Sequence, residues 1–263
     1  MDRDEDKLRP LLGTTLILMA HPDDEIIICG ALMQKMKKAI VAFATDGAPR
    51  DDHFWKQYGS RETYADLRRD EARRALAIAG AQPLFLADRV HGGIADQELF
   101  RNLPQAITAF EQVVKDINPD CILVPAYEGG HPDHDSACFI GWIVERETGV
   151  PVWESPLYHR NADGSPAVQA FPSQSGTEVE LRVEGEALEI KAKMFATYKS
   201  QNLTLGLFHP ERETFRPLRG YNFRQPPLRW KLNYEHWQWK MTGSEVSAAF
   251  ADYLDSAARS ASL

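Results

Sequence analysis

The sequence predicts an α/β fold: a Rossmann-like, largely parallel sheet with helices on both faces, plus a C-terminal covering region. Two observations carry this prediction. Through about the first 150 residues, short apolar runs alternate with amphipathic stretches of helical length, which is typical of βαβ units. After about Pro156 the pattern changes, because Pro, Gly and Ser interrupt residues 161–176 and the apolar runs become shorter.

Each element of the first part follows from its local pattern. The apolar runs predict strands at 14–20, 39–45, 83–87, 121–126 and from 150 to 153, and the stretches between them predict helices at 25–38, 61–80, 103–117 and 135–148. The helix over 61–80 has apolar residues at helical spacing, arginines on the other face and Gly80 as its stop. Asn118-Pro119 ends the helix over 103–117, and Gly149 ends the helix over 135–148.

The second part is less regular. The alternating residues 178–183 predict a half-exposed strand, and 186–199 predicts a helix, whereas the aromatic, Pro and Arg content of 203–239 gives no clear period. We therefore expect a Rossmann-like catalytic core over 1–157. We expect 158–263 to pack on that core and shape the pocket, so that the two parts form a single domain overall.

Composition excludes several classes of protein. With 263 residues, 43% of them hydrophobic, the chain is long enough to bury a normal core, and a net charge of −8 argues against a nucleic-acid partner. The N-terminal MDRDEDKLRP lacks the apolar core of a signal peptide, and no apolar run approaches the ~20 residues of a membrane span. Three cysteines in apolar settings indicate reduced thiols, so we expect a cytoplasmic protein. The sequence gives no prediction of oligomeric state.

Two clusters of histidine and carboxylate follow predicted strands. Ala20-His21-Pro22-Asp23-Asp24-Glu25 comes directly after Leu16-Ile17-Leu18-Met19, and His131-Pro132-Asp133-His134-Asp135 follows the run over 121–126. Because ligands bind at the carboxyl ends of strands in α/β sheets, we expect both clusters to lie at one edge. Imidazole and carboxylate groups together are the ingredients of a hydrolytic metal centre.

The donor types predict a zinc site with one open position. His21 and Asp24 are two residues apart at a strand-to-helix turn, and His134 from the other cluster completes a His-Asp-His set. We therefore expect one Zn²⁺ per chain, with another divalent metal as the alternative. Asp23 would stay unligated and act as general base toward water.

The other members of the clusters have more than one possible role. His131 would either donate to an oxyanion or protonate a leaving amine. Asp133 or Asp135 would orient whichever histidine it reaches. Asp23 and Asp24 are equally explained as helix caps. Dinucleotide, phosphate-loop and serine-hydrolase motifs are absent from the sequence.

These motifs resemble the LmbE-like/PIG-L family of zinc-dependent N-acetylglucosaminyl deacetylases. Thr45-Asp46-Gly47, Arg68-Arg69-Asp70-Glu71 and Tyr198-Lys199-Ser200-Gln201 are similar to further family elements, whereas the segment from Leu86 to Gly93 lacks the family's Pro-Asp-Gly. The resemblance implies zinc ligands at His21, Asp24 and His134, a base at Asp23 and an oxyanion or acid histidine at His131. It also implies substrate contacts at Arg68 and Asp46, although a salt-bridged helix arginine explains Arg68 equally well.

The function implied by the resemblance is hydrolysis of the N-acetyl group of an N-acetylglucosamine-containing small molecule. The products would be acetate and a free amine. A zinc amidase acting on a non-sugar amide and a non-catalytic carbohydrate-binding homologue are the alternatives. The aromatic residues Trp230, Tyr234, Trp237 and Trp239 either stack on a sugar or form the core of the covering region.

Overall fold

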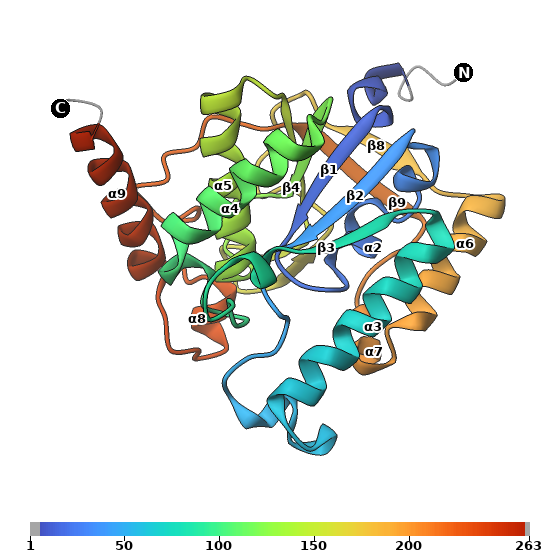
Figure 1. Cartoon of the computed structure of the whole chain (residues 1–263), viewed down its shortest axis with the longest axis horizontal. Coiled ribbons are helices and arrows are strands. Elements are labelled where there is room, and N and C mark those ends of the chain that lie inside the picture. Colours follow the sequence, from blue (N-terminus) through green and yellow to red (C-terminus); the bar gives the residue numbers. More distant parts are fainter. Residues whose placement is uncertain (1–5, 261–263) are drawn as a thin grey trace.

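The structure, a computed structural model, describes residues 6–260 (Figure 1). The first five residues of the charged N-terminal segment and the last three of the chain lie outside the described residues. The main sheet has seven strands in the order β3-β2-β1-β4-β5-β9-β8. Its strands are β1 (Thr14–Met19), β2 (Lys38–Phe43), β3 (Gln82–Phe85), β4 (Cys121–Pro125), β5 (Val152–Ser155), β8 (Val179–Arg182) and β9 (Arg212–Pro217). The helices are α2 (Asp24–Cys29), α3 (Arg61–Ala79), α4 (Leu103–Ile117), α5 (Pro132–Thr148), α6 (Gly185–Thr197), α7 (Asn202–Leu205), α8 (Asn233–His236) and α9 (Gly243–Ser260).

The sheet is largely parallel, as the sequence predicts. β1 pairs in parallel with both β2 and β4, and β3 and β5 extend the parallel part outward. β9 and β8 add an antiparallel edge beyond β5. Because the chain leaves β1 toward β2 on one side and reaches β4 on the other, the strand order reverses between β1 and β4. This switch point is where ligands bind in open α/β sheets.

Both faces of the sheet are covered by helices, which confirms the predicted fold class. Successive residues of a strand point to opposite faces, so Leu16 and Leu18 lie in one core cluster, which also contains residues of α4, α5 and α9. Ile17 and Met19 pack on the other face with α2, α3 and α6. Figure 1 shows these two helical layers on either side of the strands.

The predicted helix over 25–38 is wrong in its second half. α2 ends at Cys29, residues Leu32–Lys35 form a 3₁₀ turn, and β2 begins at Lys38. The cause is a buried ion pair, in which Lys191 Nζ lies 2.7 Å from Glu213 Oε1. Glu213 accepts the backbone N–H groups of Ala31 and Leu32, at 2.6 and 2.9 Å, so they do not continue the helical ladder.

Other boundaries differ by a few residues. α5 begins at Pro132, three residues before the prediction, so that His134 lies within its first turn. The predicted strand over 150–153 occupies Val152–Ser155. The half-exposed strand and the helix of the second part are confirmed as β8 and α6.

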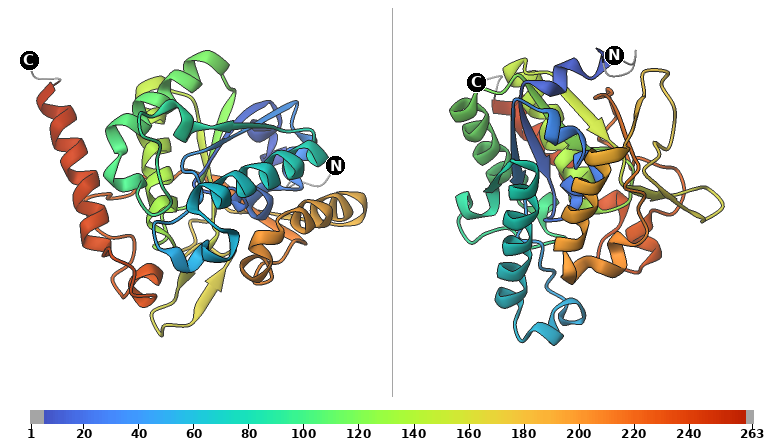
Figure 2. Two further views of the ribbon diagram at one scale, coloured as in Figure 1. Left: turned by 60° about the horizontal axis from the view of Figure 1, so that its bottom comes forward. Right: turned by 90° about the vertical axis from the view of Figure 1, so that its right-hand side faces the viewer.

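The residues after 157 continue the main sheet and cover its ends. β9 pairs with β5, and α9 packs against α5 on the outer side of α4. The short hairpin of β6 (Tyr158–Arg160) and β7 (Pro166–Val168) projects from the body of the molecule, as Figure 2 shows. The boundary at residue 157 stays a prediction, because the sheet runs across it. Among the described residues, none of the helices has the length and apolar character needed to cross a bilayer.

Candidate metal centre

Two loops meet at the switch point of the sheet. The loop after β1 carries His21 and Asp23 and leads into α2, which begins at Asp24. The loop after β4 carries His131 and leads into α5, whose first turn holds His134. Since β1 and β4 are parallel neighbours, both loops lie at the same edge. All five side chains are buried, with at most 6% of each residue exposed.

The three predicted metal ligands converge on one carboxylate. Asp24 Oδ1 lies 3.2 Å from His134 Nε2, and Asp24 Oδ2 lies 3.5 Å from His21 Nδ1. Neither ring nitrogen of His134 makes a hydrogen bond within the part of the chain that the structure describes, although both are buried. A buried polar nitrogen without a well-aligned hydrogen bond is costly, and a cation bound beside Asp24 would take the lone pair of Nε2.

A second donor group overlaps the first. Donor atoms of His21, Asp96, His131 and Asp133 all lie within 4.8 Å of one another. The backbone N–H of Asp133 donates to His131 Nδ1 at 3.1 Å, so that nitrogen carries no proton. The proton of neutral His131 must then sit on Nε2, which faces Asp96 Oδ1 at 3.3 Å. A protonated nitrogen is no metal ligand, and this favours the set of His21, Asp24 and His134.

Asp133 is the carboxylate, of the two expected to orient a histidine, that contacts His21. Its carboxylate accepts the backbone N–H groups of Gln97 and Leu99, at 2.6 and 2.9 Å, and its Oδ2 lies 3.1 Å from His21 Nε2. In the neutral form of His21, with Nε2 donating to Asp133, the lone pair of Nδ1 faces Asp24. Asp135, the alternative orienting carboxylate, instead accepts two backbone N–H groups of the loop at residues 128 and 129.

Asp23 is held apart from the donor set. Its backbone has φ 123°, an uncommon value for a residue with a side chain, and its Oδ1 lies 3.0 Å from Arg68 Nη2. Burial raises the pKa of Asp23 to about 7, although the Arg68 guanidinium opposes this. The terminal nitrogens of Arg68 also donate to the carbonyl oxygens of Pro22 and Gly47, both at 2.5 Å. Protein groups therefore occupy this guanidinium, and its predicted substrate contact stays a prediction.

The charges of the site favour a cation. Four buried carboxylates, those of Asp23, Asp24, Asp96 and Asp133, surround the histidines, and Arg68 pairs with two of them, Asp23 and Asp96. Burial opposes protonation of His21, but the neighbouring carboxylates raise its pKa well above the ordinary value. Burial alone would raise the pKa of Asp24, yet the two histidines hold it well below its usual range. Nitrogen and oxygen donors with surplus negative charge fit a divalent ion such as zinc.

Asp96 lies in the site but was not predicted from the sequence, whereas the predicted Asp46 contacts protein groups beside the site. Asp96 enters the site from a loop joined to Pro49 by a single β-bridge, and only the preceding apolar Ile94-Ala95 hinted at a strand there. Asp46 pairs with Arg61 and accepts the N–H of Ala48, so its role toward substrate stays a prediction.

Of the two roles expected for the aromatic residues after 203, the structure shows the core role for Tyr234, and stacking on a sugar stays a prediction. Tyr234 belongs to the core of the covering region. The ring of Trp239 meets that of His131 edge-on, with the ring centres 4.9 Å apart. Trp237 is 62% exposed. Trp239 thus contributes to the wall of the site.

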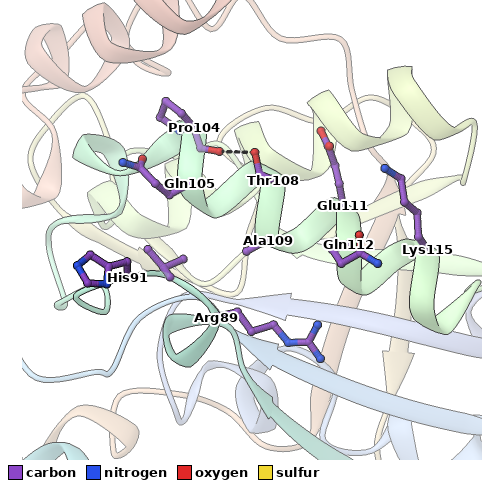
Figure 3. A pocket seen from close by; sticks show the side chains of 10 residues that line it. Arg89, His91, Pro104, Gln105, Thr108, Ala109, Glu111, Gln112 and Lys115 are labelled. Atoms are coloured by element: carbon purple, nitrogen blue, oxygen red, sulfur yellow. Dashed lines mark hydrogen bonds between the residues drawn. The ribbon is translucent and has the colours of Figure 1, made fainter.

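A surface groove of about 870 Å³ lies elsewhere, between the segment 89–91 and α4 (Figure 3). Arg89 and His91 line one side, and residues 104–115 of α4 line the other. None of the side chains that line it belongs to the metal cluster.

The fold and the site together define a class, an α/β protein with a buried His/Asp cluster at the switch point of its sheet. Residues 16–143 match the model of the PIG-L family, described as GlcNAc-PI de-N-acetylase. This match confirms the resemblance drawn from the motifs.

The individual relatives have low sequence identity to this chain. The 2′-N-acetylparomamine deacetylase of Streptomyces fradiae is 27% identical over 135 residues, which are 46% of this chain and about half (48%) of that protein's length. The solved structure of the A40926 pseudoaglycone deacetylase Dbv21 matches with a TM-score of 0.62 and 19% identity, covering 79% of this chain and 99% of that one. GalB, the 4-carboxy-2-hydroxymuconate hydratase of Pseudomonas putida, matches with a TM-score of 0.50 and 14% identity over 79% of this chain and 97% of its own. The two structures share the fold, and it serves more than one reaction.

Proposed function

We propose that this protein is a metal-dependent deacetylase that hydrolyses the N-acetyl group of an acetylated sugar or glycoconjugate. The observation that carries the proposal is the convergence of His21 and His134 on Asp24, with Asp23 beside them and held off the donor set. Relatives named as deacetylases of acetylated, sugar-related compounds support the substrate class.

His21, Asp24 and His134 would hold the ion, with zinc as the first choice. A divalent ion bound there supplies Lewis acidity toward an amide carbonyl and a water molecule. Asp23 takes a proton from the attacking water at its carboxylate, while Arg68 keeps that carboxylate in place. The new bond joins the water oxygen to the acetyl carbon, and the C–N bond breaks.

His131 stabilises the charge that develops on the carbonyl oxygen. Its Nε2 carries the proton, because Nδ1 accepts from the backbone of Asp133. A neutral imidazole with a fixed N–H is suited to donate to an oxyanion. The proton taken by Asp23 is then available to the leaving amine, so the products are acetate and a free amine.

Acetate release and bound metal, measured in parallel, test the proposal. The panel would hold N-acetylglucosamine, its glycosides, short chito-oligosaccharides and simple acetamides, with chelated and zinc-restored protein as the pair of controls. We expect acetate from the sugars, loss on chelation and recovery on adding zinc. His131→Ala should slow turnover by roughly 10²–10³ with metal still bound. Acetate from non-sugar amides alone would replace the proposal with an amidase.

A further inference from the structure

Asp23 has a backbone conformation that must be held by its neighbours. Its φ of 123° lies in a region that residues with side chains rarely adopt, and such a conformation persists only where surrounding contacts determine it. Two contacts act on Asp23 directly. Its N–H donates to Glu25 Oε2 at 3.0 Å, and its Oδ1 lies 3.0 Å from Arg68 Nη2.

The first of these contacts depends on a distant part of the chain. Glu25 is fully buried, and its second oxygen, Oε1, accepts the hydroxyl of Tyr198 at 2.5 Å. Tyr198 is also fully buried and lies directly after α6. Because a buried carboxylate needs partners for both oxygens, Tyr198 keeps Glu25 turned so that its other oxygen meets the Asp23 N–H.

The contact between Asp23 and Arg68 depends on the same segment, the residues that follow α6. Ser200 donates its backbone N–H and its hydroxyl to Glu71, at 3.0 and 2.6 Å. Gln201 Nε2 donates to the hydroxyl of Tyr64 at 2.7 Å. Tyr64 and Glu71 lie four residues before and three residues after Arg68 on α3, so these bonds fix the two turns that flank it.

We propose that residues 198–201 form a clamp that positions Asp23 from both sides, through Glu25 on its backbone and through α3 on its Arg68 partner. Tyr198 and Ser200 are thus positioning residues that touch none of the reacting atoms. The catalytic consequence rests on the proposed function, whereas the effect on the conformation of Asp23 does not.

The test is Tyr198→Phe, which removes one hydroxyl, with Tyr221→Phe as the matched control. The hydroxyl of Tyr221 also donates to a buried carboxylate, that of Glu154, at 2.8 Å. A crystal structure of each variant gives the φ of Asp23 and its distance to Arg68, and assays give kcat, KM and bound metal. In Tyr198→Phe we expect Asp23 to leave its positive φ or lose Arg68, with kcat lower by roughly 10-fold to 100-fold. KM and metal content should stay within about twofold, and Tyr221→Phe should match the wild type.

Two results would overturn the clamp: Asp23 unchanged in the Tyr198→Phe structure, or an equal loss in Tyr221→Phe. If Tyr198→Phe does not fold, Ser200→Ala takes its place, because it leaves one of the two bonds to Glu71; an unchanged kcat and Asp23–Arg68 distance would then refute the proposal. If the wild type releases no acetate from any substrate, the proposed function fails, and the crystal structures alone decide whether the clamp exists.

Discussion

Replacing Asp133 by Asn tests whether a carboxylate behind His21 sets the affinity of the site for metal. Asp133 is fully buried, and its two oxygens face three donors: His21 Nε2 and the backbone N–H groups of Gln97 and Leu99. An asparagine keeps the volume of the side chain, but it supplies one oxygen where two are needed. The NH₂ group of the asparagine must then face either a backbone N–H or His21 Nε2, and it can accept a hydrogen bond from neither.

The expected magnitude follows from the bonds that are lost. A hydrogen bond to a charged group contributes about 1.5–3 kcal/mol, which corresponds to a factor of roughly 10–150 in a dissociation constant. Changes in groups that orient a metal ligand typically lower metal affinity about 10-fold to 100-fold. We therefore expect the Kd for zinc to rise by roughly 10-fold to 100-fold, together with a loss of about 1–3 kcal/mol in the free energy of unfolding.

The assay is a zinc titration in competition with a chromophoric chelator, run beside urea unfolding of the metal-free protein. Asp120→Asn is the control, because Asp120 Oδ2 accepts the N–H of Thr14 at 2.7 Å, at the opposite end of β1 from His21. Its Kd for zinc should equal that of the wild type. A folded Asp133→Asn protein that binds zinc within twofold of the wild type would refute the reasoning.

Three further substitutions separate the roles in the site from the stability of the fold. His134→Ala should reduce bound metal from near one equivalent to a small fraction, and full retention by elemental analysis would contradict its place in the donor set. Asp23→Asn should lower kcat by roughly 10²–10⁴ with metal still bound, whereas activity within a few-fold of the wild type would mean that another group is the base. Lys191→Met leaves Glu213 buried without its cation, so urea unfolding should show a loss of roughly 3–5 kcal/mol. The exposed Lys193→Met on the same helix should stay within about 0.5 kcal/mol, and equal losses in the two would contradict the ion pair's role.

Local periodicity was sufficient for most of the fold. The helix at Leu103–Ile117 is found at its predicted bounds, because its apolar face and its Asn118-Pro119 stop are both local signals. The helix over 25–38 shows the limit of such signals. It ends early because Glu213, far along the chain, takes two of its N–H groups. Nothing near residue 30 in the sequence specifies that partner.

In the site, too, local signals predict some residues, whereas contacts with distant residues place others. His21 and His134 could be predicted to meet, since each follows a strand and parallel strands end at one edge. Asp96 could not, because a single β-bridge rather than a strand brings it in. The clamp at residues 198–201 was visible only as a family-like motif. Its contacts with Glu25 and Glu71 depend on how α6 packs against α3.

The groups around the site come from both sides of residue 143, where the family match ends. The polar atoms of the cluster all come from residues within 16–143, the part that matches the PIG-L family. Two aromatic rings that pack against His131 and His134 come from residues after 143. The ring centre of Tyr158 lies 5.4 Å from that of His134, and the ring of Trp239 contacts that of His131. A cation and an amide need only the first set of groups. Under the proposed function, the acetyl group would meet groups from within 16–143, whereas the rest of a larger substrate would meet the rings of Tyr158 and Trp239.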